Sequence, residues 1–185
     1  PEGNNENSGT SSEDPLQTLS LALDLIYANA ENPRKIYLAD GVYSPTLTNE
    51  IFPLVGKNNV SITGESVENT ILDGDSLSRL IALDEISEFK VESLTIRNGY
   101  ESRGGAISCI NSAPVFQSIL FLQNRSVVAA GVLEQQESSP VFINCSFVAN
   151  SSDAGATGVT VFNSPSYPVF INSLVLSGSV IVFKG

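Results

Sequence analysis

The sequence predicts an all-β fold: a single-stranded right-handed parallel β-helix, or solenoid, with a capping α-helix at its N-terminal end. Three observations predict it. A phrase beginning Pro-Val-Phe recurs at Pro114, Pro140 and Pro168, at spacings of 26 and 28 residues. Short apolar stretches alternate with Asn- and Gly-containing turns, and helical periodicity is confined to the N-terminal part. A repeat of this length fits one β-helix coil, whereas propeller blades need about 40 residues.

The N-terminal helix has a start signal and a one-sided apolar stripe. Asp14 is the expected N-cap and Pro15 suits the first helical position, so we predict a helix at about Leu16–Asn29. We expect one domain over residues 1–185, with the N-terminal segment and capping helix in 1–34 and the coils in 35–185. The stripe that should cover the end of the solenoid comprises Leu16, Leu19, Leu23 and Ile26, widened by Ala22 and Leu25.

Strand-like stretches follow the helix. Lys35–Ala39 is predicted as the first strand, and Asp40-Gly41 as the turn after it. No later interval is long or periodic enough for a second helix. Four further apolar stretches before the repeats are predicted strands: Val60–Thr63, Thr70–Leu72, Leu80–Leu83 and Phe89–Ile96.

The repeats predict which residues stack on one another. Equivalent positions of successive coils should lie in columns and share chemistry. The column of Ser118, Asn144 and Asn172 is polar, as expected at a turn where side-chain amides hydrogen-bond along the stack. Two columns are apolar and should fill the core: Phe116/Phe142/Phe170 and Phe121/Phe147/Val175.

Composition narrows the functional classes. The net charge of −11 argues against nucleic acid as a partner, because phosphate binding needs a basic face. The absence of histidine removes His-based metal sites and Ser-His or Cys-His nucleophiles. No apolar run reaches the roughly 18 residues needed for membrane insertion. The abundance of Ser, Thr and Asn predicts an extracellular or cell-surface protein, exported with its signal peptide already removed.

The two cysteines are predicted to be buried free thiols. Cys109 aligns with Gln135 one coil on, whereas Cys145 aligns with Ile119 of the preceding coil. Because they occupy different columns, stacking does not bring them within the roughly 7 Å between Cα atoms that a disulfide requires.

Acidic residues cluster in one region and have two interpretations. Asp73 and Asp75 could form a Ca²⁺ site or a hydrolytic pair, or Asp73-Gly74-Asp75 could be a solvated turn, which we favour. We therefore expect no catalytic, cofactor-binding or metal-binding residues. The clustered acids are Asp73, Asp75, Asp84, Glu85, Glu88 and Glu92.

Two further motifs also have two interpretations. Arg103-Gly104-Gly105 is interpreted as a glycine pair at a coil corner rather than an anion contact. Asn-X-Ser/Thr sequons make Asn59, Asn124 and Asn150 candidate glycosylation sites, although such motifs also arise by chance. A fourth sequon begins at Asn144, which we expect to be the least accessible because it should lie in a stacked turn.

Several phrases resemble the pectate-lyase-like right-handed β-helix superfamily, and are most similar to its exported surface proteins whose N-terminal motif has no assigned function. The resemblance implies that the polar N-terminus belongs to the first coil. Enzymes of that superfamily use clustered carboxylates with Ca²⁺ or paired aspartates, and stacked acid pairs are missing from the coils after Gly104. The resembling phrases are Gly3–Thr10, Asp14–Leu19, Ile36–Tyr43, Asn59–Gly64, Thr70–Gly74 and Ser139–Phe147.

These features predict a non-enzymatic structural or adhesive module, without a cofactor. The alternative is a carbohydrate-binding or polysaccharide-cleaving β-helix, with carbohydrate as the partner. The apolar stretch at the C-terminal end predicts a further partner, a second copy, because an uncovered coil is a template for pairing. Head-to-tail stacking into a filament would then use Val180, Ile181, Val182 and Phe183.

Overall fold

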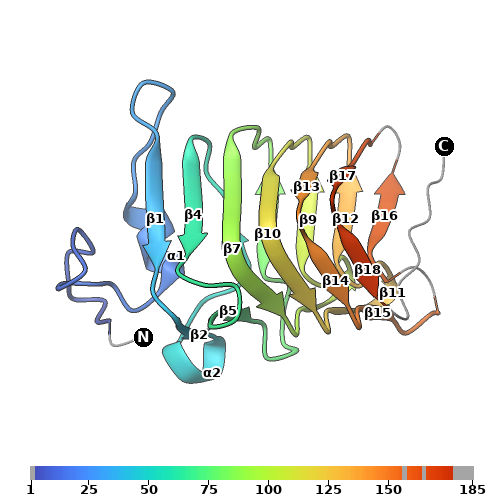
Figure 1. Cartoon of the computed structure of the whole chain (residues 1–185), viewed down its shortest axis with the longest axis horizontal. Coiled ribbons are helices and arrows are strands. Elements are labelled where there is room, and N and C mark those ends of the chain that lie inside the picture. The colour runs from blue at the N-terminus through green and yellow to red at the C-terminus, as the bar shows by residue number, and fades with distance from the viewer. Residues whose placement is uncertain (1–2, 156–157, 164–165, 177–185) are drawn as a thin grey trace.

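Left-handed corner residues divide the chain into short strands. The computed structural model describes residues 3–155, 158–163 and 166–176. In the predicted polar column, Ser118, Asn144 and Asn172 have φ angles of 54°, 52° and 47°. Short polar side chains tolerate this region better than β-branched ones. The corners turn the strands into a parallel β-helix of about five turns, as predicted (Figure 1).

The largest sheet runs along one side of the solenoid, and its main path follows the order β1-β4-β7-β10-β13-β17 (Figure 1). All its ladders are parallel, each strand pairing with the equivalent strand of a neighbouring coil. Its ten strands are β1 (Arg34–Leu38), β2 (Gly41–Tyr43), β4 (Val60–Gly64), β5 (Thr70–Asp73), β7 (Phe89–Arg97), β10 (Val115–Leu122), β13 (Val141–Ile143), β14 (Ser146–Val148), β17 (Val169–Ile171) and β18 (Leu174–Leu176).

Two smaller parallel sheets complete the coils. Every predicted strand before the repeats is present, with each bound shifted by one residue at most. The second sheet contains β3 (Leu54–Val55), β6 (Ile81–Asp84), β9 (Ile107–Ile110), β12 (Leu133–Gln136) and β16 (Thr160–Asn163). The third contains β8 (Tyr100–Arg103), β11 (Arg125–Ala129) and β15 (Ser151–Ser152).

The two predicted phenylalanine columns form the centre of the core. The register pairs Phe116 with Phe142 and Phe142 with Phe170, and their rings stack with centroids 5.3 and 5.0 Å apart. Phe121 and Phe147 stack beside them at 4.9 Å, and the two columns meet edge to face. Stacked and edge-to-face contacts both suit the ring quadrupole. The coil period read from the repeats is therefore confirmed.

Helix α1 (Leu19–Leu25) caps the N-terminal end but is shorter than predicted. Leu19 and Leu23 are buried in the core, whereas Leu25 is 64 % exposed, so its place in the stripe was wrong. Asp14 is not the N-cap, because its carboxylate accepts hydrogen bonds from the backbone N–H and hydroxyl of Ser8. These bonds fold the polar N-terminal segment back on itself before the helix begins.

A distant carboxylate caps α1 instead. Glu50 is 3 % exposed, and its Oε2 and Oε1 accept from the backbone N–H groups of Leu19 at 2.7 Å and Ser20 at 2.9 Å. A carboxylate at a helix N-terminus satisfies donors that lack partners within the helix. A second helix, α2 (Pro45–Thr48), was also not predicted, since four residues are too few to show periodicity.

Candidate functional site

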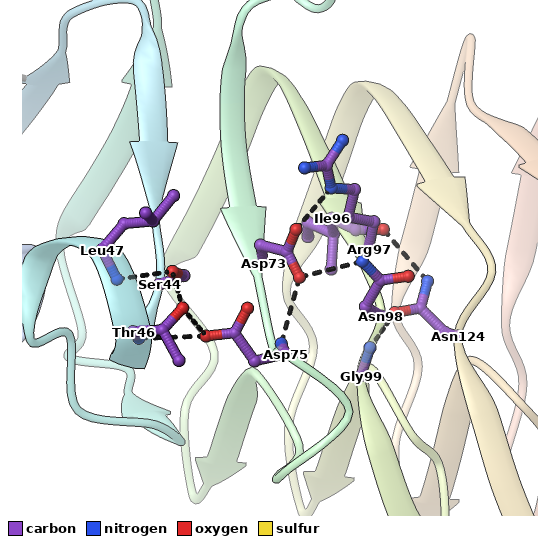
Figure 2. A network of polar contacts seen from close by, with 10 residues as sticks. All are labelled: Ser44, Thr46, Leu47, Asp73, Asp75, Ile96, Arg97, Asn98, Gly99 and Asn124. Carbon is purple, nitrogen blue, oxygen red and sulfur yellow. Dashed lines mark hydrogen bonds and ion pairs between the residues drawn. The ribbon is translucent and has the colours of Figure 1, made fainter.

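The Asp73 carboxylate, the first member of the predicted acidic cluster, lies between two coils. Asp73 ends β5 and pairs in register with Arg97 at the end of β7. Its Oδ2 is 2.6 Å from Arg97 Nε, and its Oδ1 accepts from Asn98 Nδ2 at 2.9 Å and from the Asp75 N–H at 3.0 Å (Figure 2). Asp73 is 6 % exposed, so this is a buried, fully bonded carboxylate.

The Asp75 carboxylate is directed toward α2 rather than toward Asp73 (Figure 2). Its Oδ2 accepts from both the backbone N–H and the hydroxyl of Thr46, at 3.0 and 2.8 Å. Ser44 caps the same helix by accepting from the Leu47 N–H at 3.2 Å. Asp75 therefore attaches α2 to the next coil.

The chain turns at Asp73-Gly74-Asp75, as we favoured, but the turn is only partly open to solvent. The turn is not solvated at Asp73, because Arg97 and Asn98 surround the carboxylate. The guanidinium supplies the positive charge that a bound cation would supply. Among the described residues, no three Cys, Asp or Glu side chains gather as a potential metal site.

The other clustered acids lie on different sides of the solenoid. Asp84 ends β6 in the second sheet, and Asp84, Glu85 and Glu88 are exposed. Glu92 lies on the outer face of β7, where it pairs with Lys90 and, at 3.2 Å, with Lys35. Proximity in sequence therefore did not produce one carboxylate site.

The ion pairs of Glu92 change the pKa of its carboxyl group. The Lys90 ammonium first, and then Thr63 and Lys35, lower the pKa of Glu92 to about 2. Thr63 Oγ1 donates to Glu92 Oε1 at 2.8 Å. A general acid needs the opposite shift, toward the working pH. Glu92 is therefore an anion at neutral pH, and its contacts join three coils.

The Arg103-Gly104-Gly105 motif forms a coil corner, as predicted. Gly104 has a φ of 57°. The carbonyls of Arg103 and Gly104 accept from Nη2 and Nε of Arg79, at 2.5 and 2.9 Å. Arg79 Nη2 also contacts Glu134 Oε2 at 3.0 Å, so one side chain joins three successive coils. Sequence reasoning missed Arg79, which stands alone in an unremarkable polar turn.

Two of the candidate glycosylation sites are buried in an asparagine ladder. Asn124 and Asn150 are 0 % and 1 % exposed. Asn124 Nδ2 donates to the Ile96 carbonyl at 3.0 Å, and its Oδ1 accepts from the Gly99 N–H at 2.9 Å (Figure 2). Asn124 Nδ2 also donates to Asn150 Oδ1 at 3.0 Å. These amides hydrogen-bond along the stack. We had expected that arrangement at a different column, the one formed by Ser118, Asn144 and Asn172.

Accessibility of the sequons differs from what we predicted. Asn144 was expected to be the least accessible, but it is exposed at its corner. Asn59 is partly exposed, whereas Asn124 and Asn150 are enclosed. Glycosylation stays a prediction at all of these positions, and Asn59 and Asn144 are the two whose side chains reach solvent.

Both cysteines are buried and free, as predicted. Cys109 pairs in register with Gln135, and the offset of 26 residues between β10 and β14 places Cys145 beside Ile119. Burial raises the pKa of the Cys109 thiol strongly and that of Cys145 to about 11. Neither thiol is therefore disposed to act as a nucleophile, since the thiolate is the reactive form.

The predicted assembly surface, Val180, Ile181, Val182 and Phe183, lies outside the described residues. In the described part of the chain, neither helix has the length and apolar character needed to cross a bilayer.

Comparison with known proteins gives one result. The model of a family described as "Protein of unknown function (DUF1565)" matches residues 2–163, which is most of the chain. No curated protein and no solved structure was found to match. The strands, columns and corners described above lie mainly within the matched residues. The chain belongs to the DUF1565 family, a family of β-helix proteins without an assigned activity.

Proposed function

We propose that this chain is a non-enzymatic structural or adhesive module that is extracellular or lies at the cell surface. One observation carries the proposal: charged side chains that could perform chemistry are used to join neighbouring coils. The pairs span the solenoid from its N-terminal coils to its C-terminal ones. They are Lys35–Glu92, Asp73–Arg97, Arg79–Glu134 and Arg125–Asp153.

Burial determines how much each of these pairs contributes to stability, and the buried pair supports a structural role. Exposed ion pairs contribute little, at about 0–1 kcal/mol each. Asp73 is different, because its side chain is 8 % exposed and a buried carboxylate needs its partner. The pairs also fix register, since each connects defined positions on different coils. A rigid, extended solenoid with neutral Ser-, Thr- and Asn-rich turns suits display at a surface.

The same proposal includes the superfamily of the chain, its export and its location. Descent from the pectate-lyase-like superfamily, export and a surface location are inferred from the phrases quoted above and from composition. The DUF1565 match supports the β-helix and leaves these finer assignments as proposals. Head-to-tail filament formation, through Val180–Phe183, likewise rests on sequence alone.

An activity screen tests the non-enzymatic part. The purified chain is incubated with acidic and neutral polysaccharides, with and without Ca²⁺, and unsaturated and reducing ends are measured. We expect none to be released. Release that is lost in a folded Asp73→Asn variant would show that the site is catalytic and would overturn the proposal.

Carbohydrate binding without cleavage is the second candidate, and one observation favours it. Tyr37 on the outer face of β1 is 76 % exposed, with Lys35 Nζ 5.5 Å from its ring centroid. An exposed aromatic ring beside polar side chains suits stacking on a sugar. Binding to immobilised polysaccharide that is lost in Tyr37→Ala, but kept in the equally exposed Tyr27→Ala, would favour this candidate.

A further inference from the structure

The corner after β7 contains the only asparagine of the sequence that is followed by glycine, in the pair Asn98-Gly99. Such a pair is chemically labile, because glycine has no side chain to keep its backbone nitrogen away from the carboxamide of the preceding residue. Asparagine is a thermolabile residue in proteins generally. The pair is therefore the position at which this chain is most open to deamidation.

Packing requires glycine at position 99. Gly99 is buried, and a Cβ atom there would lie 2.2 Å from the backbone carbonyl oxygen of Gly105. A backbone atom cannot move aside as the end of a flexible side chain can. Asn98 has a φ of 52°, in the left-handed region that asparagine tolerates. The fold thus keeps a labile pair at this corner.

Deamidation would join the Gly99 backbone nitrogen to the side-chain carbonyl carbon, Cγ, of Asn98. The bond between nitrogen and Cγ forms, the bond between Cγ and Nδ2 breaks, and ammonia leaves with the amide proton of Gly99. Water then opens the cyclic imide at either carbonyl, which leaves aspartate or isoaspartate at position 98. The reaction needs water alone, but the Gly99 nitrogen has to turn toward the Asn98 side chain.

Side chains from two neighbouring coils hold the reacting groups in place (Figure 2). The Gly99 N–H donates to Asn124 Oδ1 at 2.9 Å, so the attacking nitrogen is bound to the following coil. Asn98 Nδ2 donates to Asp73 Oδ1, also at 2.9 Å, so the leaving amide is bound to the preceding coil. The nitrogen and the carboxamide have different partners, and neither is free to turn toward the other.

Backbone hydrogen bonds fix the chain on both sides of the same peptide unit. The Asn98 carbonyl accepts from the Ser76 N–H, and the Gly99 carbonyl accepts from the Arg125 N–H, both at 2.8 Å. The peptide plane cannot rotate while these bonds to neighbouring coils are in place. Attack therefore requires local opening of the corner, and the rate of deamidation measures how often it opens.

We infer that Asn98 is a deamidation site that Asp73 and Asn124 keep closed, and that its modification opens the corner irreversibly. The carboxylate formed at position 98 would face Asp73 Oδ1, which accepts from the Asn98 amide. Asp73 is 6 % exposed, so two like charges would meet with little water to screen them. Isoaspartate also lengthens the main chain, which disturbs the register of the coil. The inference is independent of the proposed surface role.

Peptide mapping measures the reaction without any substitution. The folded chain and a urea-unfolded sample are incubated at mildly alkaline pH, and the tryptic peptide Asn98–Arg103 is analysed for the gain in mass that accompanies replacement of an amide by a carboxyl group. Enzymatic methylation identifies isoaspartate. We expect Asn98 to react about a hundredfold or more slower in the folded chain. Folded and unfolded rates within about tenfold of each other would overturn the inference.

Two variants test the two contacts. Asn124→Ala removes the acceptor of the Gly99 N–H and should speed deamidation of the folded chain about tenfold or more. Asp73→Asn, which removes the charge that holds the Asn98 amide, should also speed it. Leu23→Ala is the control, since it lowers stability from the N-terminal cap and leaves both contacts in place. Equal acceleration by Leu23→Ala, compared at equal global stability, places the reaction in the unfolded chain and contradicts the inference, as does no acceleration by either contact variant.

Asn98→Asp reproduces one product and tests its consequence. Its midpoint of urea unfolding should fall further below that of wild type than the midpoint of Asn144→Asp, which adds the same charge at an exposed corner. Equal midpoints for the two variants would show that modification does not open the corner. Should Asn124→Ala not fold, Asp73→Asn and the comparison of folded with unfolded wild type still decide whether the site is kept closed.

Discussion

The side chain of Asn124 donates a hydrogen bond to Oδ1 of Asn150, one coil along, at 3.0 Å. The Asn124 backbone N–H donates to the same oxygen at 2.9 Å, and Asn150 Nδ2 donates to the Phe121 carbonyl at 3.0 Å. Stacked amides thus satisfy buried backbone groups at a corner where strand ladders are interrupted. A buried polar group without a partner is costly, so this ladder determines whether coils close at that corner.

Asn124→Ala should lower the free energy of unfolding by about 2–4 kcal/mol. The change leaves the Ile96 carbonyl and the Gly99 N–H without the partners that Asn124 provides, and each unsatisfied buried group costs about 1–3 kcal/mol. Urea unfolding followed by circular dichroism measures it. Asn144→Gly is the matched control, since this corner residue is exposed and glycine accepts its φ of 52°, so its effect should stay within about 0.5 kcal/mol. Equal effects at the two positions would contradict the ladder.

Leu23→Asp should destabilise the chain far more than Leu25→Asp. Leu23 is 2 % exposed under the cap, and aspartate there buries an unpaired charge, with an expected loss on the order of 4 kcal/mol. Leu25, two residues on, is 64 % exposed and should lose less than about 1 kcal/mol. Thermal unfolding compares them. Similar melting temperatures would mean that α1 does not cover the core as described.

Both thiols should be unreactive in the folded chain. Burial removes access and raises both thiol pKa values, so little thiolate exists at pH 8. Labelling with a chromogenic disulfide reagent, without reductant, should give no fast reaction in buffer and two thiols per chain in denaturant. Fewer than two in denaturant would indicate a disulfide, and rapid labelling in buffer would place a thiol at the surface.

Glu92 should contribute to stability at neutral pH and lose that contribution in acid. Its folded-state pKa of about 2 lies below the ordinary value of 4.5, so the stabilisation is complete above about pH 4.5 and is lost as the pH falls toward 2. Comparing urea unfolding at pH 5 and pH 3, Glu92→Gln should lose less stability than wild type over this window. Glu88→Gln, at an exposed position, should behave like wild type. A Glu92→Gln curve parallel to wild type would sink this prediction.

Features repeated at the coil period were predictable from sequence. The phenylalanine columns followed from the recurring Pro-Val-Phe phrase, and register confirms them. Asn124 and Asn150 carried the same signal, a spacing of 26 residues, but their sequons directed attention to glycosylation. Asp73 and Arg97 are also about one coil apart, so aligning the earlier, weaker coils would have paired them.

The contacts that cap a helix from a distant part of the chain could not be predicted from the sequence in this way. Glu50 caps α1 from about 30 residues away, and nothing local to Glu50 or Leu19 indicates that contact. Asp14 satisfied the local rule for an N-cap, yet it bonds Ser8 because the segment before the helix folds back. Local propensity placed a helix in the right region, and tertiary contacts determined where it begins.

A double-mutant cycle on Asp73 and Arg97 tests the central claim most directly, namely that the clustered carboxylates join coils. Free energies of unfolding are measured for wild type, Asp73→Asn, Arg97→Gln and the double variant. If the 2.6 Å contact between buried Asp73 and Arg97 stabilises neighbouring coils, each single change is costly and the two are coupled by about 1–3 kcal/mol. Additive effects, with coupling below about 0.3 kcal/mol, would contradict the claim and return Asp73 to the candidates for chemistry.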